Sequence, residues 1–232
     1  MKIYDRLQKS GSIACKEIKF KRLKQGEIPM TILKHSIKPE QHFAQLKDDI
    51  LKQDPHLYTF DFKNVINENG AAKPISAEDF WRTLKIKAQK VPLFVDEILS
   101  CEVTESVPHG FIREISMAGG DVTQVSGVKT THITERVVID DRTKTILFFQ
   151  LETNGEILLF AINHVSEENN VVYFSGHYVY SVSKNSKNPQ DQAFMKGSTD
   201  TLPVRFVEMI ERMKALARSD QFEKIYQELV SF

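Results

Sequence analysis

Apolar and polar residues alternate in short runs from about Ser100 to Val182, and the pattern becomes helical from Asp200 to Phe232. Period-two alternation is typical of half-buried strands, whereas apolar residues at helical spacing are typical of an amphipathic helix. Strands of this kind bury their apolar face against another layer. The sequence therefore predicts an α+β fold in which one curved antiparallel sheet wraps around a long carboxy-terminal helix. A sheet that curls around one helix usually encloses a space, so ligand binding is the leading hypothesis.

The predicted strands are bounded by turn signals rich in Gly, Asn and Pro. They are expected at 58–66, 99–105, 111–117, 130–139, 144–153, 156–165 and 171–182. After the first strand, the stretch 76–79 (Ser-Ala-Glu-Asp) predicts a helix start, because a hydroxyl and a carboxylate at this spacing satisfy free backbone N–H groups. The helix that follows carries Phe80, Trp81 and Leu84.

The last helix is expected to begin near Asp200, after a polar loop at 183–198. Pro203 then falls in the first turn, where proline is tolerated. A second cap signal at 220–223 predicts a bend near Ser219.

The dipeptide Asn154-Gly155 is the strongest hairpin signal in the chain, because a two-residue I′ turn requires positive φ at both positions. This turn pairs Leu151 with Leu158, Phe149 with Phe160, and Leu147 with Ile162. A three-residue turn at 168–170 then brings Phe160 beside Tyr178 and Leu158 beside Tyr180. We expect these residues to form the concave face of the sheet, with His164 on the same side and His132 and His177 on the other.

Residues 1–56 are interpreted as an accessory segment, with a short hairpin around Gly26 and a helix after Pro39. Residues 1–38 hold ten basic and three acidic side chains, a balance of +7, although the whole chain is neutral. A basic arm suits an acidic partner, but it also suits docking on the chain's own acidic remainder, which we favour. The overall neutrality argues against nucleic-acid binding.

Several function classes lack a signature in the sequence. No window approaches the roughly 20 apolar residues of a membrane span. The amino terminus lacks the apolar core of a signal peptide, and Cys15 and Cys101 lie far apart, so we expect reduced thiols in a cytoplasmic protein. The histidines do not gather on one strand face with a carboxylate, and no nucleophile motif is present. We therefore expect no metal, no cofactor and no catalytic residue that a motif identifies.

Two charged residues share the apolar parity of their predicted strands. Arg113 lies in phase with Phe111 and Ile115, and Glu135 lies in phase with Ile133 and Val137. If both parities face inward, the two charges are neighbours inside the fold, where a charge is costly unless it is paired. One hypothesis is a polar handle that orients a ligand carboxylate or carbonyl, and the other is a structural ion pair or a position at the sheet rim.

The order of elements resembles the START-like (SRPBCC) helix-grip superfamily and, within it, the AtaL-like family of unknown function. The similar stretches are 75–81 (Ile-Ser-Ala-Glu-Asp-Phe-Trp), 84–88, 101–103, 110–115 and 135–137. The resemblance covers residues 57–232, and residues 1–56 depart from it. It implies a cavity between sheet and helix for a hydrophobic or aromatic small molecule. A few superfamily members are cyclases or dehydratases, but the family offers no catalytic set to transfer.

We therefore predict a helix-grip domain at 57–232 that binds a small hydrophobic or aromatic molecule without a covalent bond. One alternative is a cyclase or dehydratase that uses Glu135 as acid or base beside Arg113. Another is a partner-binding module that acts through residues 1–56. The predicted ligand-binding residues are Arg113, Glu135, Leu147, Phe149, Phe160, Tyr178, Phe206, Met209 and Met213.

Overall fold

The computed structural model describes residues 55–67, 73–118, 124–125, 128–129, 132–151 and 157–230. The expectations for residues 1–54 and for the turn at 154–155 lie outside these ranges. A seven-stranded antiparallel sheet has the order β1-β9-β8-β7-β6-β3-β2. Its strands are β1 (Leu57–Val65), β2 (Ile98–Val107), β3 (Gly110–Met117), β6 (His132–Asp140), β7 (Thr145–Leu151), β8 (Ile157–Glu168) and β9 (Val171–Ser183). A separate two-stranded pair joins β4 (Gln124–Val125) and β5 (Val128–Lys129).

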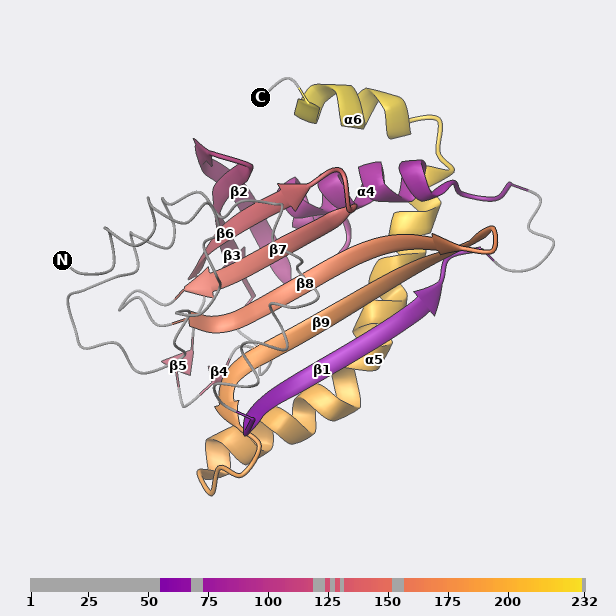
Figure 1. Cartoon of the computed structure of the whole chain (residues 1–232). Helices are drawn as coiled ribbons and strands as arrows, with labels where there is room; N and C mark the ends of the chain where they lie inside the picture. Colours follow the sequence, from indigo (N-terminus) through magenta and orange to yellow (C-terminus); the bar gives the residue numbers. More distant parts are fainter. Residues whose placement is uncertain are drawn as a thin grey trace, which may run out of the picture.

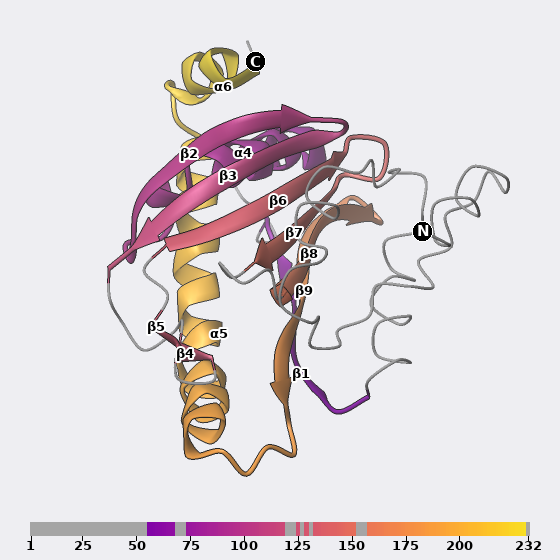
Figure 2. The same cartoon turned by 90° about the vertical axis from the view of Figure 1, so that its left-hand side faces the viewer.

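The helices gather on one side of this sheet. The order along the chain is α4 (Ala77–Gln89), η1 (Val91–Leu93), α5 (Pro189–Ala217) and α6 (Phe222–Val230). Figures 1 and 2 show the sheet curving around α5, with α4 on the same side and α6 beyond α4. The predicted α+β fold with a curved sheet and a long carboxy-terminal helix is therefore confirmed. We call the sheet face toward α4 and α5 the inner face and the opposite face the outer face.

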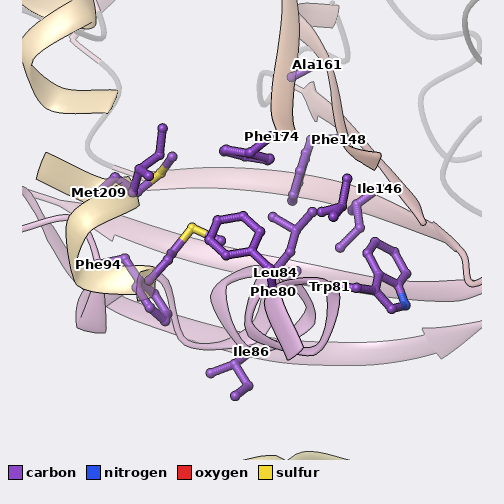
Figure 3. Packing of buried hydrophobic residues seen from close by; sticks show 14 of the residues in the cluster. Phe80, Trp81, Leu84, Ile86, Phe94, Ile146, Phe148, Ala161, Phe174 and Met209 are labelled. Atoms are coloured by element: carbon purple, nitrogen blue, oxygen red, sulfur yellow. The ribbon is translucent and has the colours of Figure 1, made fainter. Parts of the chain in front are cut away.

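Helix α4 begins where the sequence predicts. The Ser76 side chain accepts a hydrogen bond from the Asp79 backbone N–H, and its hydroxyl donates to the Asp79 carboxylate. This cap satisfies a backbone donor that has no partner within the helix. Phe80 and Leu84 of α4 then lie with Phe148 and Phe174 of the sheet in one buried cluster (Figure 3).

Helix α5 is longer than the sequence predicts, because it begins at Pro189 and not near Asp200. Asn188 caps its start by accepting from the Gln190 backbone N–H, and Pro189 occupies the first turn, where its missing N–H costs nothing. Pro203 consequently lies inside the helix. The burial of Phe194 in the cluster between sheet and helices stabilises the added turns, and tertiary packing of this kind overrides the weak local propensity.

The predicted bend near Ser219 is confirmed, since α5 ends at Ala217 and α6 begins at Phe222. Helix α6 returns onto α4 through Arg82, whose Nη1 and Nη2 donate to the Glu223 carboxylate at 2.7 and 2.6 Å. The guanidinium also lies over the Tyr226 ring, 4.0 Å from its centroid.

The β7–β8 register agrees with the predicted hairpin over most of its length. Phe149 pairs with Phe160 and Leu147 pairs with Ile162. The predicted pair of Leu151 with Leu158 is wrong, because an irregularity after Gln150 shifts Leu151 onto Ile157. A bulge of this kind inserts one residue in one strand and leaves the rest of the ladder intact.

The β8–β9 register differs from the prediction by one residue. The turn contains two residues, Asn169 and Asn170, with φ of 53° and 63°. Asparagine tolerates this left-handed conformation, which is the one that a I′ turn requires at both positions. Phe160 therefore pairs with Val179, and Tyr178 pairs with Ala161. A slip of one residue moves every side chain to the other face, so the predicted neighbours Phe160 and Tyr178 lie on opposite faces.

This slip separates the predicted lining residues into two groups. The inner-face row through Tyr178 runs across six strands as Phe60, Tyr178, Ala161, Phe148, Val137 and Phe111. Leu147, Phe149 and Phe160 lie on the outer face, and the prediction that they line the same interior as Tyr178 is wrong. His164, which pairs with Thr145, also lies on the outer face.

The outer face is buried as well as apolar. Leu147, Phe149, Phe160 and Val179 are each fully buried, although α4, α5 and α6 all lie on the other side of the sheet. Arg136 shares this face, is fully buried, and donates from Nη2 to the Pro108 carbonyl at 2.7 Å. These residues contribute to stability and not to the interior between sheet and helices.

Truncation of an outer-face ring tests this assignment. We expect Phe160→Ala to lower the free energy of unfolding by about 3–5 kcal/mol, because it removes a fully buried ring and leaves a cavity. Urea denaturation measures the change. The control Val207→Ala removes an exposed side chain on α5 and should change stability by less than about 0.5 kcal/mol. Equal effects of the two substitutions would contradict the burial of Phe160.

Candidate ligand-binding site

Arg113 and Glu135 form a buried ion pair on the inner face. They are direct partners on β3 and β6, with 3% and 6% of their surfaces exposed. The Arg113 Nε donates to Glu135 Oε2 at 2.7 Å, and Nη2 donates to the same oxygen. The predicted position of the pair, inside the fold on neighbouring strands, is confirmed.

The pair also anchors α4 to the sheet. Arg113 Nη1 donates to the Ala88 carbonyl in the last turn of α4, where backbone acceptors lack a partner within the helix. The guanidinium lies over the Phe148 ring, 4.9 Å from its centroid. Each of the three guanidinium nitrogens of Arg113 thus makes a hydrogen bond to β6 or α4, which is the arrangement of a positioning residue.

Lys87 is the functional candidate that the sequence analysis missed. It lies on α4 with 7% of its surface exposed, and its Nζ lies 4.9 Å from the centroid of the same Phe148 ring. Within the part of the chain that the structure describes, its amine makes no hydrogen bond or ion pair. A signal was present, because Lys87 continues the helical spacing of the apolar residues Phe80 and Leu84.

Burial lowers the pKa of Lys87 to about 8, and the nearby positive charge of Arg113 acts in the same direction. Glu135 and Cys101 oppose this shift but do not outweigh it. Removing a charge from water disfavours its charged form. The amine of Lys87 is therefore held in an environment that lacks an adequate counter-charge.

A second polar contact lies on the inner face at Tyr178. Its hydroxyl donates to Asn163 Oδ1 at 3.1 Å, and both residues are buried. Burial raises the pKa of the Tyr178 hydroxyl, so it stays neutral and acts as a donor. The Asn163 side chain thus satisfies the hydroxyl locally. Asn163 Nδ2 is buried without a hydrogen-bond partner.

Aromatic rings fill the inner side where β1 and β9 face α5. The Phe206 ring of α5 lies 4.5 Å from Phe62, 5.3 Å from Phe60 and 5.0 Å from Tyr178, centroid to centroid. Such ring pairs stabilise beyond the area that they bury. Phe62 also lies over Gly176, where an added Cβ would fall 2.2 Å from the Phe62 ring. This part of the inner face therefore requires a glycine opposite the ring.

The interior side of α5 carries the predicted methionines. Met209 and Met213 are buried in the cluster that also holds Phe80 and Phe94. Figure 3 shows Met209 together with these two rings. Of the predicted lining residues, the structure thus brings Arg113, Glu135, Tyr178, Phe206, Met209 and Met213 to the space between the inner face and the helices. Ligand contact by these residues stays a prediction.

The described ranges hold neither a cluster of metal-ligating side chains nor a helix that could span a membrane. No group of three or more His, Cys, Asp or Glu side chains is placed there to hold a metal ion. None of the helices there has the length and apolar character that crossing a membrane requires.

A curved antiparallel sheet around a long carboxy-terminal helix defines the START-like, Bet v 1-like helix-grip class. Within this class the chain belongs to the AtaL family, whose model is described as "Acetylaranotin biosynthesis cluster protein L" and matches residues 60–219. A search of curated proteins gives no match.

Three solved structures are similar to this chain. The Zhui aromatase/cyclase from Streptomyces sp. R1128 has a TM-score of 0.50 at 14% identity, over 70% of this chain and 94% of that one. Ara h 8.0201 has a TM-score of 0.46 at 12% identity, over 68% of this chain and 99% of that one. The ginseng major latex-like protein 151 from Panax ginseng has a TM-score of 0.47 at 13% identity, over 71% of this chain and 99% of that one. At these identities the similarity is one of fold alone.

The dependence of Arg113 on its partner is testable by removing the carboxylate. We expect Glu135→Leu to lower the free energy of unfolding by about 3–5 kcal/mol, because it leaves a buried guanidinium unpaired. Adding Arg113→Met in the same chain should recover much of that loss in urea denaturation.

The matched control is Glu168→Gln in the exposed pair of Lys63 and Glu168, whose side chains are 50% and 56% exposed. That change should cost less than about 1 kcal/mol. A small effect of Glu135→Leu alone would contradict the burial of this pair.

Proposed function

We propose that this chain binds a small hydrophobic or aromatic molecule, without a covalent bond, between the inner face of the sheet and helices α4 and α5. The observation that carries the proposal is the set of Lys87, Arg113 and Glu135, which is buried among aromatic and aliphatic side chains. Replacing a buried ion pair by apolar residues is often neutral or stabilising, so stability alone is a weak reason for such a set.

The surroundings suit an aromatic guest. The inner-face row next to the row of Arg113 and Glu135 presents Phe148, Tyr178 and Phe60. Ligand sites for small molecules are mostly apolar, with a few polar groups that fix orientation. The helix-grip fold supports the same proposal by analogy, and one protein of similar fold is an aromatase/cyclase by name.

The enzyme alternative keeps the same residues. Both hydrogen bonds from Arg113 fall on Glu135 Oε2, so a cyclase or dehydratase would use a carboxylate that is held in one orientation. A bound molecule that is recovered chemically unchanged after prolonged incubation favours the binding function, and conversion to a product favours the alternative.

The test is native mass spectrometry of the full chain purified from its own cell extract. We expect an additional mass that is present under native conditions and lost on denaturation. Gln150 lies beside Glu135 on the inner face, so Gln150→Trp should remove the additional mass by filling the interior. Glu114→Trp places the same ring on the exposed side of β3 and should retain it.

Two results would contradict the proposal. One is a chain that carries no additional mass and also fails to bind any member of a panel of naphthalene and indole derivatives. The other is binding that Glu114→Trp abolishes and Gln150→Trp leaves unchanged.

A further inference from the structure

The charged set on the inner face is not electrically balanced. It holds two cationic side chains, Lys87 and Arg113, and one carboxylate, Glu135. All three are more than nine-tenths buried. A buried charge without a counter-charge is among the costlier features of a protein interior.

Of the two cations, Lys87 and not Arg113 is the one that lacks a hydrogen-bond acceptor among the described residues. Each guanidinium nitrogen of Arg113 has an acceptor, which is Glu135 Oε2 or the Ala88 carbonyl. The Lys87 amine has no such acceptor among the described residues, and its contact is the face of the Phe148 ring. An ammonium group can donate three hydrogen bonds, so the site lacks acceptors on this side of the pair.

We propose that the molecule bound in this interior carries a carboxylate, and that Lys87 pairs with it beside Arg113. This inference rests on the proposed function and names the class of ligand: an aromatic or aliphatic body with one compact anionic group. The carboxylate supplies the missing negative charge and the missing acceptors together. A hydrogen bond between two charged groups is stronger than one between neutral groups, above all where water is excluded.

The groups that face Lys87 come from four strands. They are Arg113 on β3, Glu135 on β6, Cys101 on β2 and the uncharged ring of Phe148 on β7. The hydroxyl of Tyr178 on β9 lies further along the same face and stays neutral. Among these groups the Lys87 amine is the one whose protonation an added anion favours most, because it is the cation without a partner.

The sign of the pH dependence follows from this pairing. Free Lys87 has a pKa of about 8, and a bound carboxylate raises it by favouring the charged form. Binding is therefore at full strength below pH 8 and weakens as the pH rises above that value. In the pH range just above 8, each binding event takes up a proton.

The experiment compares two probes of one shape, 2-naphthoate and the neutral 2-naphthamide, by isothermal titration calorimetry on the full chain. At pH 7 we expect the acid to bind at least about tenfold more tightly than the amide. By pH 10 the affinity for the acid should have fallen by about tenfold, while the affinity for the amide stays constant.

Variants of Lys87 test whether this side chain causes the preference for the acid over the amide. Lys87→Met should reduce the preference for the acid to less than about twofold, and the conservative Lys87→Arg should retain it. The matched control Lys90→Met removes an exposed lysine from the end of the same helix and should retain the preference in full.

The outcomes separate the two claims. Equal binding of acid and amide by the native chain overturns the anionic ligand and leaves the proposed function standing. Failure of both probes to bind overturns the proposed function for naphthalene ligands, and the inference with it. If Lys87→Met does not fold, the pH profile of the native chain decides alone, because a preference that is unchanged between pH 7 and 10 excludes the Lys87 amine.

Discussion

The two-residue turn between β8 and β9 decides which side chains face the helices. Asn169 and Asn170 both adopt positive φ. In the register that follows, Ala161 pairs with Tyr178 on one side and with Phe148 on the other, so that the three residues lie in one inner row. A turn with one more residue would exchange the two faces of β8 relative to β9. With Tyr178 still facing the helices, the inner row would then hold Phe160 and Phe149 in place of Ala161 and Phe148.

The charged set depends on this arrangement because it needs both the sheet and α4. Arg113 links β3, β6 and the last turn of α4 through its terminal nitrogens. Lys87 enters from the same turn of α4 and shares the Phe148 ring with Arg113. An aromatic face tolerates a cation better than an aliphatic side chain does, which offsets part of the cost of burying two positive charges. The site is thus assembled by packing, and no single strand contains it.

Local patterns in the sequence predicted the fold class, the α4 cap, the β7–β8 register at Phe149 and the inward position of Arg113 and Glu135. Each of these depends on residues close in the chain or on the parity of one strand. The start of α5 was missed because the burial of Phe194 against the sheet stabilises a segment of weak helical pattern. Phe160 was placed on the wrong face because the register between β8 and β9 depends on the length of the turn that joins them, and this turn has two residues and not three. Lys87 was missed because a charged side chain is usually expected to face solvent, although its spacing places it on the apolar side of α4.

We propose that the inner face, and not the outer face, receives an apolar guest. Intermolecular nuclear Overhauser effects between a bound naphthalene ring and methyl groups of the full chain test this placement directly. We expect contacts from the ring to the methyl groups of Ala161 and Ile146, which face the helices. Contacts confined to Ile162 and Leu147, which lie one position along the same strands on the outer face, would contradict it.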